Sequence, residues 1–213
     1  GAHDRFLSLE MIWPDNALLR AYVLSPRLGQ ISADLLDVPA VRLYHDNVLA
    51  KQAGCGRTPW HFDDHHFPLD TNDVVTAWVP AQPIPLEMGP LTFAYPLDVH
   101  ELVNAVTFEK TGNGYDRGVS DVFSKNNVSV NETPFELGEV SFHHNLNFHT
   151  ASGNRTNRSR VALANTYYRD GARVVNAPTM VSGDWQKFMP NVKPGDVAAS
   201  PLNPICWPVK DKS

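Results

Sequence analysis

The sequence has little of several features that would assign it to a particular class of protein. Its 213 residues contain only two cysteines, Cys55 and Cys206, whose separation fits neither a metal-binding nor a redox motif. We therefore expect two free thiols in a reducing compartment, and hence a cytoplasmic protein. No apolar run reaches the roughly 18 residues of a membrane span, and no secretory leader pattern is evident, so we expect no membrane partner.

Positive charge is also sparse. Eighteen lysines and arginines stand against 23 aspartates and glutamates, which gives a net charge of -5, and no run of basic residues occurs. A protein that binds nucleic acid usually carries a basic patch, so we expect no nucleic-acid partner. These features leave a small molecule as the expected partner, and they do not indicate an oligomeric state.

The composition is that of a globular protein built from short elements. The chain is 42% hydrophobic, and its 17 prolines and 13 glycines are scattered along its length. Frequent turn residues disfavour long helices and favour an all-β or α+β fold. The length suits a single domain over residues 1–213.

Periodicity divides this domain into three parts. Residues 1–40 are predicted to form N-terminal helices, because apolar residues recur at helical spacing between 17 and 36, with a break at Pro26. Residues 41–176 are predicted to form a β core. Its strand-like segments are "VRLYHDNVLAK", "DVVTAWVPAQ", "GPLTFAYP", "ELGEVSFHHNLNFHT" and "RVALANTYYRDGARV". Residues 177–213 form an irregular, proline-rich tail.

A long insertion interrupts the β core at residues 98–133. It begins with a possible helix over 98–109 and continues through a polar stretch rich in glycine and asparagine. Long insertions of this kind are usually lids, binding loops or mobile segments. Short strands with one long insertion predict a mainly β fold with flanking helices, a double-sheet barrel or jelly roll.

The densest group of candidate ligands is "HFDDHH", residues 61–66. On an extended strand, residues i and i+2 point to the same side, so His61 and Asp63 would project together. A third histidine from elsewhere would complete a set of two histidines and one carboxylate. That set leaves positions open on the metal and is typical of non-haem Fe(II) oxygenases.

A distal partner for this pair exists in "NFHTASGNRTNRSRVA". His149 ends an apolar strand, and Arg160 follows eleven residues later in the next strand pattern. If the two strands are antiparallel neighbours, these residues lie close together. An arginine near such a metal can hold the distal carboxylate of a chelating keto acid through two parallel hydrogen bonds.

These motifs resemble the phytanoyl-CoA dioxygenase family of Fe(II)/2-oxoglutarate oxygenases. The resemblance rests on "WHFDDHHFP", "VVTAWVP", "EMGPLTF" and "HTASGNRTNRSRVA", and runs in the family's order from about Leu43 to Tyr168. It implies a double-stranded β-helix of the jelly-roll, cupin-like type. It also implies Fe(II), 2-oxoglutarate as co-substrate, and dioxygen.

The resemblance also implies roles for individual residues. His61, Asp63 and His149 would bind iron, and Arg160 would hold the C5 carboxylate of 2-oxoglutarate. Further expected co-substrate contacts are Trp78, Lys51, Tyr44 and Thr58.

The chain departs from the family at two places near these residues. Relatives often carry serine two residues after the distal histidine; here that residue is Ala151, so either Ser152 replaces the contact or the contact is lost. Relatives often carry glutamine between the proximal ligands, and here Phe62 would change the pocket beside the iron.

The other polar residues near the motifs are interpreted as follows. The prolines that flank the motif argue against a helix that would pair His61 with His65, so neither His65 nor His66 is expected to bind metal. Asp64 is expected in solvent, and Trp60 in packing. Alternation from His149 back along its strand would point His143 inward and His144 outward. His45 and His100 are expected at the surface.

The predicted function is hydroxylation of a small organic molecule with release of succinate and CO2. Desaturation or ring chemistry on the same site stays open, and the substrate is not identified. Two other classes also stay open: a non-catalytic jelly-roll module with a vestigial metal site, and a cupin-like isomerase or hydrolase that uses zinc or manganese. Arg160 favours the oxygenase over both. Asp63 argues against a halogenase, which needs that ligand position empty for chloride.

Overall fold

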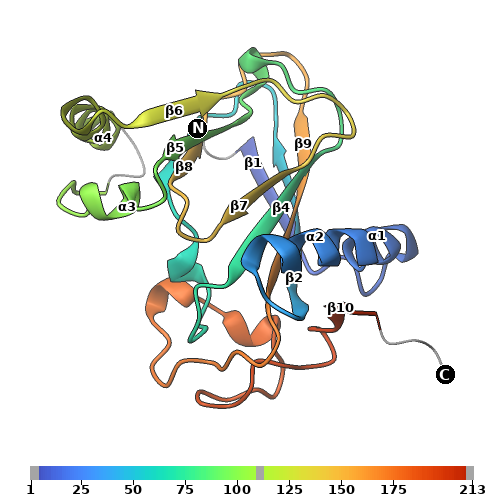
Figure 1. Ribbon diagram of the computed structural model, residues 1–213. Helices are drawn as coiled ribbons and strands as arrows, with labels where there is room; N and C mark the ends of the chain where they lie inside the picture. Colours follow the sequence, from blue (N-terminus) through green and yellow to red (C-terminus); the bar gives the residue numbers. More distant parts are fainter. Residues whose placement is uncertain (1–4, 109–112, 210–213) are drawn as a thin grey trace.

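The computed structural model describes residues 5–108 and 113–209, and its framework is two antiparallel sheets that face each other (Figure 1). The larger sheet has the strand order β1-β2-β9-β4-β7, with β10 also paired to β2, and the smaller sheet has the order β3-β8-β5-β6. The larger sheet comprises β1 (Phe6–Glu10), β2 (Val41–Lys51), β4 (Val74–Pro80), β7 (Ser141–His144), β9 (Arg160–Arg169) and β10 (Ile205–Trp207). The smaller comprises β3 (Thr58–His61), β5 (Leu91–Tyr95), β6 (Ser129–Glu132) and β8 (His149–Ala151). The mainly β fold predicted from turn residues and alternation is confirmed.

Two apolar layers hold the larger sheet in place. On its inner face, Trp78 and Ala164 pack against Leu91 and Phe93 of the smaller sheet. Its outer face is covered by helix α2 (Pro26–Leu36), next to α1 (Ala17–Val23). The break predicted at Pro26 is confirmed, because this proline begins α2, where its missing N–H needs no partner.

The prediction that residues 1–40 are helical throughout is wrong at its beginning. Phe6–Glu10 form the edge strand β1, which pairs with residues 47–51 of β2. All five side chains of β1 are exposed. The strand is therefore held by its backbone ladder to β2, which the local pattern of five residues does not reveal.

The insertion at 98–133 is more ordered than the sequence indicated. The predicted helix over 98–109 is only the short α3 (Val99–Leu102), and residue 109 lies outside the described part of the chain. A longer helix follows, α4 (Gly114–Asn126), and then β6 pairs with β5. Tyr115, Val119 and Phe123 recur every four residues and form the buried face of α4, which many polar neighbours obscure in the sequence.

The segment 136–150 was predicted as a turn and a single strand, and the strand proves to be two. The chain leaves the larger sheet after His144, turns through residues 145–148, and joins the smaller sheet at His149. Polar side chains in the turn are satisfied across the fold, as where Asn147 donates from Nδ2 to the carbonyl of Ala94 at 3.2 Å. This crossing brings His149 from one sheet to the other.

The tail closes one end of the barrel. It contains the short turns η4 (Met180–Ser182) and η5 (Trp185–Lys187) before β10. Trp185, Phe188 and Met189 pack against Tyr44 and Tyr168 of the larger sheet. In residues 5–108 and 113–209, none of the helices has the length and apolar character that a membrane crossing requires.

Candidate metal centre

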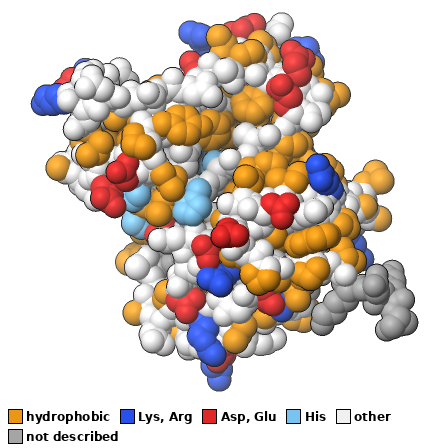
Figure 2. Space-filling model, viewed as in Figure 1, with side chains coloured by type: hydrophobic (Ala, Val, Ile, Leu, Met, Phe, Trp, Pro, Cys, Tyr) orange, Lys and Arg blue, Asp and Glu red, His pale blue; other side chains and the backbone are white. Residues whose placement is uncertain are grey.

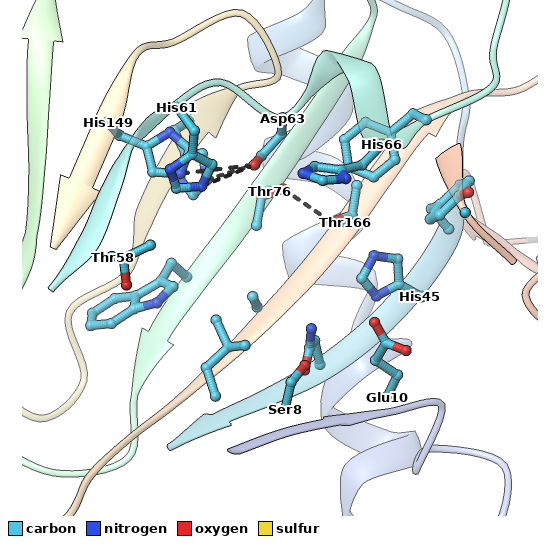
Figure 3. A pocket seen from close by; sticks show the side chains of 18 of the residues that line it. Ser8, Glu10, His45, Thr58, His61, Asp63, His66, Thr76, His149 and Thr166 are labelled. Carbon is cyan, nitrogen blue, oxygen red and sulfur yellow. Dashed lines mark hydrogen bonds and ion pairs between the residues drawn. The ribbon is translucent and has the colours of Figure 1, made fainter. Parts of the chain in front are cut away.

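A cavity of about 520 Å³ lies between the two sheets and is bounded by β1 and the tail (Figure 3). Figure 2 shows histidine side chains gathered beside a hollow on one face of the molecule, with hydrophobic side chains around them. All three predicted ligands, His61, Asp63 and His149, line this cavity, as does Arg160. The cavity is therefore the place where the sequence motifs meet.

The two ligand histidines face each other from paired strands. His61 is the last residue of β3 and lies opposite His149, the first residue of β8, with ring centroids 4.2 Å apart. Nε2 of His61 lies 3.6 Å from Oδ1 of Asp63, and Nε2 of His149 lies 3.9 Å from the same oxygen (Figure 3). The three ligand atoms lie within 4.8 Å of one another, a set that could hold a metal ion.

Hydrogen bonds orient both imidazoles. Nδ1 of His61 donates to the carbonyl of Pro59 at 2.8 Å, and Nδ1 of His149 donates to the carbonyl of Asn147 at 2.9 Å. Each acceptor lies two residues before its histidine. A proton on Nδ1 leaves the lone pair on Nε2, the atom that faces Asp63, free to bind a metal.

The protonation states suit metal binding. Burial is the main cause that lowers the pKa of both histidines, that of His149 to about 3, so both rings are neutral at pH 7. Burial alone would raise the pKa of Asp63, but His149, His143 and His61 outweigh it and hold that pKa well below its usual range. The site therefore presents two neutral imidazoles and one carboxylate, the forms in which these groups bind metals.

Strand alternation does not explain how His61 and Asp63 meet, so that part of the prediction is wrong. Strand β3 ends at His61, and Asp63 has helical backbone angles, φ -90° and ψ -15°, just before the turn η2 (Asp64–His66). Asp64 is not free in solvent, because its Oδ1 accepts a 2.8 Å hydrogen bond from Nδ2 of Asn145. Phe62 packs against His100 and His65, away from the cavity, so it does not alter the pocket beside the ligands.

Arg160 faces the same cavity from the opposite sheet. It begins β9 and is only 2% exposed, with its guanidinium 5.4 Å from the Trp78 ring centroid. Its Nε and Nη1 are buried and have no hydrogen-bond partner among the described residues. Burial lowers the pKa of Arg160 to about 10, so the group stays charged at pH 7. His149 and Arg160 are thus not antiparallel neighbours, as predicted, but face each other across the cavity.

Comparison with known proteins agrees with this arrangement. The family model for phytanoyl-CoA dioxygenase matches residues 7–162, which is more than half of the chain. The chain belongs to the phytanoyl-CoA dioxygenase family. Among proteins with curated descriptions, none matches the sequence.

Solved structures with the same fold are enzymes dependent on the same keto acid. The chain is similar to the non-heme alpha ketoglutarate dependent carbocyclase SnoK from nogalamycin biosynthesis, at 23% identity and a TM-score of 0.74, over 94% of this chain and 76% of that one. The epimerase SnoN from the same biosynthesis matches at 19% identity and a TM-score of 0.73, over 95% and 77%. EctD from S. alaskensis, solved with 2-oxoglutarate and 5-hydroxyectoine, matches at 15% identity and a TM-score of 0.64, over 92% and 68%. These identities support the fold alone, and they confirm the predicted jelly roll of the cupin type.

The residues expected at the co-substrate in this phytanoyl-CoA dioxygenase family member fall into two groups. Trp78, Tyr44 and Thr58 line the cavity, and the Nε1 atom of Trp78 and the hydroxyl of Tyr44 have no partner among the described residues. Lys51 and Ser152 lie outside it.

Lys51 and Ser152 are engaged elsewhere in the structure. Nζ of Lys51 donates to the carbonyls of Ala151 and Ser152 at 2.9 and 2.8 Å. The Ser152 hydroxyl donates to Glu132 at 3.1 Å, so it does not replace the contact that Ala151 lacks. The lysine therefore supports the end of β8 rather than facing the cavity.

Sequence reasoning missed His45, which was expected at the surface. His45 lines the cavity and stacks on Phe188 at 4.8 Å. A β-bulge between Leu43 and His45 shifts the register of β2 against β9, so Tyr44 and His45 both face inward. Simple alternation allows only one of two consecutive residues to do so.

The remaining histidines divide as follows. His143 points inward, as alternation suggested, and His144 lies outside the cavity with its Nδ1 accepting from the backbone of Leu146. His65 is exposed and lies away from the ligands, whereas His66 is exposed at the edge of the cavity. Trp60 is a packing residue, as predicted, since it stacks on Phe148 at 5.4 Å.

The wall opposite the metal ligands was also missed. Ser8 and Glu10 of β1 line it with Asn47, and Ser8 donates to the Asn47 side chain at 2.8 Å. Lys187 of η5 forms an ion pair with Glu10 at 2.6 Å and links the edge strand to the tail. The only sequence signal was the polar character of these residues, because the pairing partners come from opposite ends of the chain.

Proposed function

We propose that this protein is a non-haem Fe(II)- and 2-oxoglutarate-dependent dioxygenase that oxidises a small organic molecule, by hydroxylation in the first instance. Family membership supports an enzyme of this type. The observation that carries the proposal is that a set of two histidines and one carboxylate shares a cavity with a buried arginine that lacks an acceptor. Either feature alone occurs in other proteins; the two together meet the needs of an iron-bound keto acid.

The residues present fit both absent groups. His61, Asp63 and His149 would hold Fe(II), and their net charge of -1 partly neutralises a divalent cation. The guanidinium of Arg160 would accept the C5 carboxylate of 2-oxoglutarate, which satisfies two nitrogens that are otherwise buried without a partner. Bound iron and keto acid together supply the oxidising power, with conversion of 2-oxoglutarate and dioxygen to succinate and CO2.

The protein's own residues orient the reactants and limit access of water. Trp78 lies against the Arg160 guanidinium and keeps it directed along the cavity. Phe188 and Tyr44 form part of the wall where the tail covers the barrel, and the Glu10–Lys187 pair ties that cover to β1. We infer that the substrate enters the space between this wall and the metal ligands. The similarity of the 2-oxoglutarate enzymes, which bind small molecules, agrees with such a substrate.

Two other outcomes of the same oxidation are supported by the relatives. SnoK is described as a carbocyclase and SnoN as an epimerase, so oxidative ring closure and epimerisation are the second candidates. The mass of the product separates them. Hydroxylation adds one oxygen, ring closure removes two hydrogens, and epimerisation leaves the mass unchanged.

The binding site is tested without turnover. Under anaerobic conditions, Fe(II) and 2-oxoglutarate added together should produce a weak visible metal-to-ligand charge-transfer band. His61→Ala and Asp63→Ala should abolish the band, because each removes a metal ligand. Arg160→Ala should keep Fe(II) binding but weaken 2-oxoglutarate binding by about 100-fold, the loss of a bidentate charge-assisted contact.

The matched control is Arg158→Ala, which removes an exposed arginine near the same strand and should change neither property. If both ligand variants keep the band, the metal assignment fails. If Arg160→Ala binds 2-oxoglutarate as tightly as the wild-type protein, the arginine does not hold the co-substrate.

A further inference from the structure

A fourth histidine lies beside the metal ligands without being one of them. His143 belongs to β7 of the larger sheet, opposite Thr76 of β4, and its side chain is 5% exposed. Its ring centroid lies 4.7 Å from that of His149 and 5.6 Å from that of Phe93. A polar ring in such a buried, partly aromatic environment needs a specific partner.

The partner of His143 is Asp63. Nε2 of His143 lies 3.5 Å from Oδ2 of Asp63, whereas Oδ1 of the same carboxylate faces His61 and His149. The other ring nitrogen, Nδ1, is buried with no partner among the described residues. The two oxygens of Asp63 are therefore divided between the ligand histidines and His143.

The hydrogen-bonding inventory decides which atom of His143 carries the proton. A neutral imidazole has one N–H donor and one acceptor, and an ionised carboxylate only accepts. The Nε2 atom must then carry the proton that Asp63 accepts. A protonated Nε2 has no lone pair to offer a metal, so His143 cannot bind the metal through this atom while it holds Asp63.

We propose that His143 is a positioning residue that holds Oδ2 of Asp63, so that this carboxylate binds the metal through Oδ1 alone. The inference rests on the proposed function. A carboxylate can bind a metal through one or both oxygens, and a bidentate Asp63 would occupy a position needed by co-substrate or dioxygen. A donor fixed on Oδ2 keeps three of six positions open, which the keto acid's two oxygens and dioxygen require.

A first test compares two substitutions at His143 by Mn(II) binding, which needs neither 2-oxoglutarate nor turnover. His143→Phe fills similar space without a donor, and His143→Gln keeps an N–H near the position of Nε2. Loss of a group that orients a ligand typically weakens metal affinity 10–100-fold, so we expect that loss for the Phe variant and a change under about threefold for the Gln variant. His144→Asn, on the opposite side of the same strand, is the control and should match the wild-type protein.

The number of exchangeable waters on bound Mn(II), read from water-proton relaxation, gives a second readout. Three protein ligand atoms leave three waters on a six-coordinate ion, so the wild-type and Gln proteins should show three. The Phe variant should show fewer, because Asp63 is free to bind through both oxygens. If the Phe variant does not fold, as judged by circular dichroism, His143→Met is measured in its place.

A double-mutant cycle with Asp63→Ala separates positioning from direct ligation. If His143 acts through Asp63, replacing it in the Asp63→Ala background should leave Mn(II) affinity unchanged. Equal losses in both backgrounds would show that His143 binds the metal itself. Unchanged affinity and water number in His143→Phe would show that it only packs. Either result overturns the inference while leaving the proposed function standing, whereas a wild-type chain that binds no divalent metal would overturn both.

Discussion

Arg160 and Lys51 are two buried cations at paired positions of neighbouring strands, and their surroundings differ in kind. The ammonium of Lys51 donates to two backbone carbonyls, whereas two nitrogens of Arg160 have no acceptor among the described residues. A buried donor without an acceptor costs about 1–3 kcal/mol. The arginine is therefore arranged for a partner from outside the chain, and the lysine for the chain itself.

The Lys51 environment predicts an unusual pH dependence of stability. Burial, together with the charge of Arg160, lowers the pKa of Lys51 to about 7. In the unfolded chain a lysine has a pKa near 10.4. Between these values the unfolded chain binds more protons than the folded one, so stability rises with pH; below about pH 7 both states are protonated and the penalty is complete.

The measurement is the free energy of unfolding of the metal-free protein by urea at pH 7 and pH 9. The wild-type protein should gain about 2 kcal/mol on Lys51→Met between these values. Lys125→Met, at an exposed position of α4, is the control and should show no such gain. An equal difference between wild type and Lys51→Met at both pH values would contradict the lowered pKa.

At the scale of elements, helix α4 connects the insertion to the metal ligands. Phe123 packs edge-on against Trp60 at 5.1 Å and lies 6.2 Å from Phe148, and those two rings stack on each other. Trp60 and Phe148 each directly precede a ligand histidine. The insertion, expected from its composition to be a loop, thus supports the two strand ends that carry His61 and His149.

This support predicts a coupled loss of stability and metal affinity. Phe123→Ala should reduce the free energy of unfolding by about 3 kcal/mol, the cost of removing a buried phenylalanine. Because the strand ends lose their packing, Mn(II) affinity should also fall several-fold. Urea unfolding and metal titration check the two effects, with Ser120→Ala on the exposed face of α4 as the control. A folded Phe123→Ala protein with wild-type Mn(II) affinity would contradict the coupling.

The elements also show which parts of the site the sequence could predict. His61, Asp63, His149 and Arg160 were identifiable because residue type and order along the chain carry that information. Their geometry was not, since it depends on long-range events. The chain changes sheets between His144 and His149, a bulge redirects Tyr44, and Asp63 lies past the end of its strand. None of these leaves a local periodicity.

At the scale of the whole molecule, the cavity is built from segments that are far apart in sequence. The smaller sheet supplies two metal ligands, the larger sheet supplies Arg160, and the first strand and the tail supply the wall where Glu10 meets Lys187 (Figures 1 and 3). The parts that carry the chemistry are those that match the family motifs. The wall formed by the two ends of the chain is the part that we expect to select the substrate.

The central claim is that these parts perform one oxidation coupled to the keto acid, and its stoichiometry is the most direct test. Purified protein with Fe(II), 2-oxoglutarate and a library of small molecules is assayed for dioxygen uptake and succinate. The account predicts, for the matching compound, one succinate formed for each dioxygen consumed, and no succinate from the His61→Ala protein or without dioxygen. Wild-type protein with iron and 2-oxoglutarate bound that forms no more succinate than His61→Ala with any compound would contradict it.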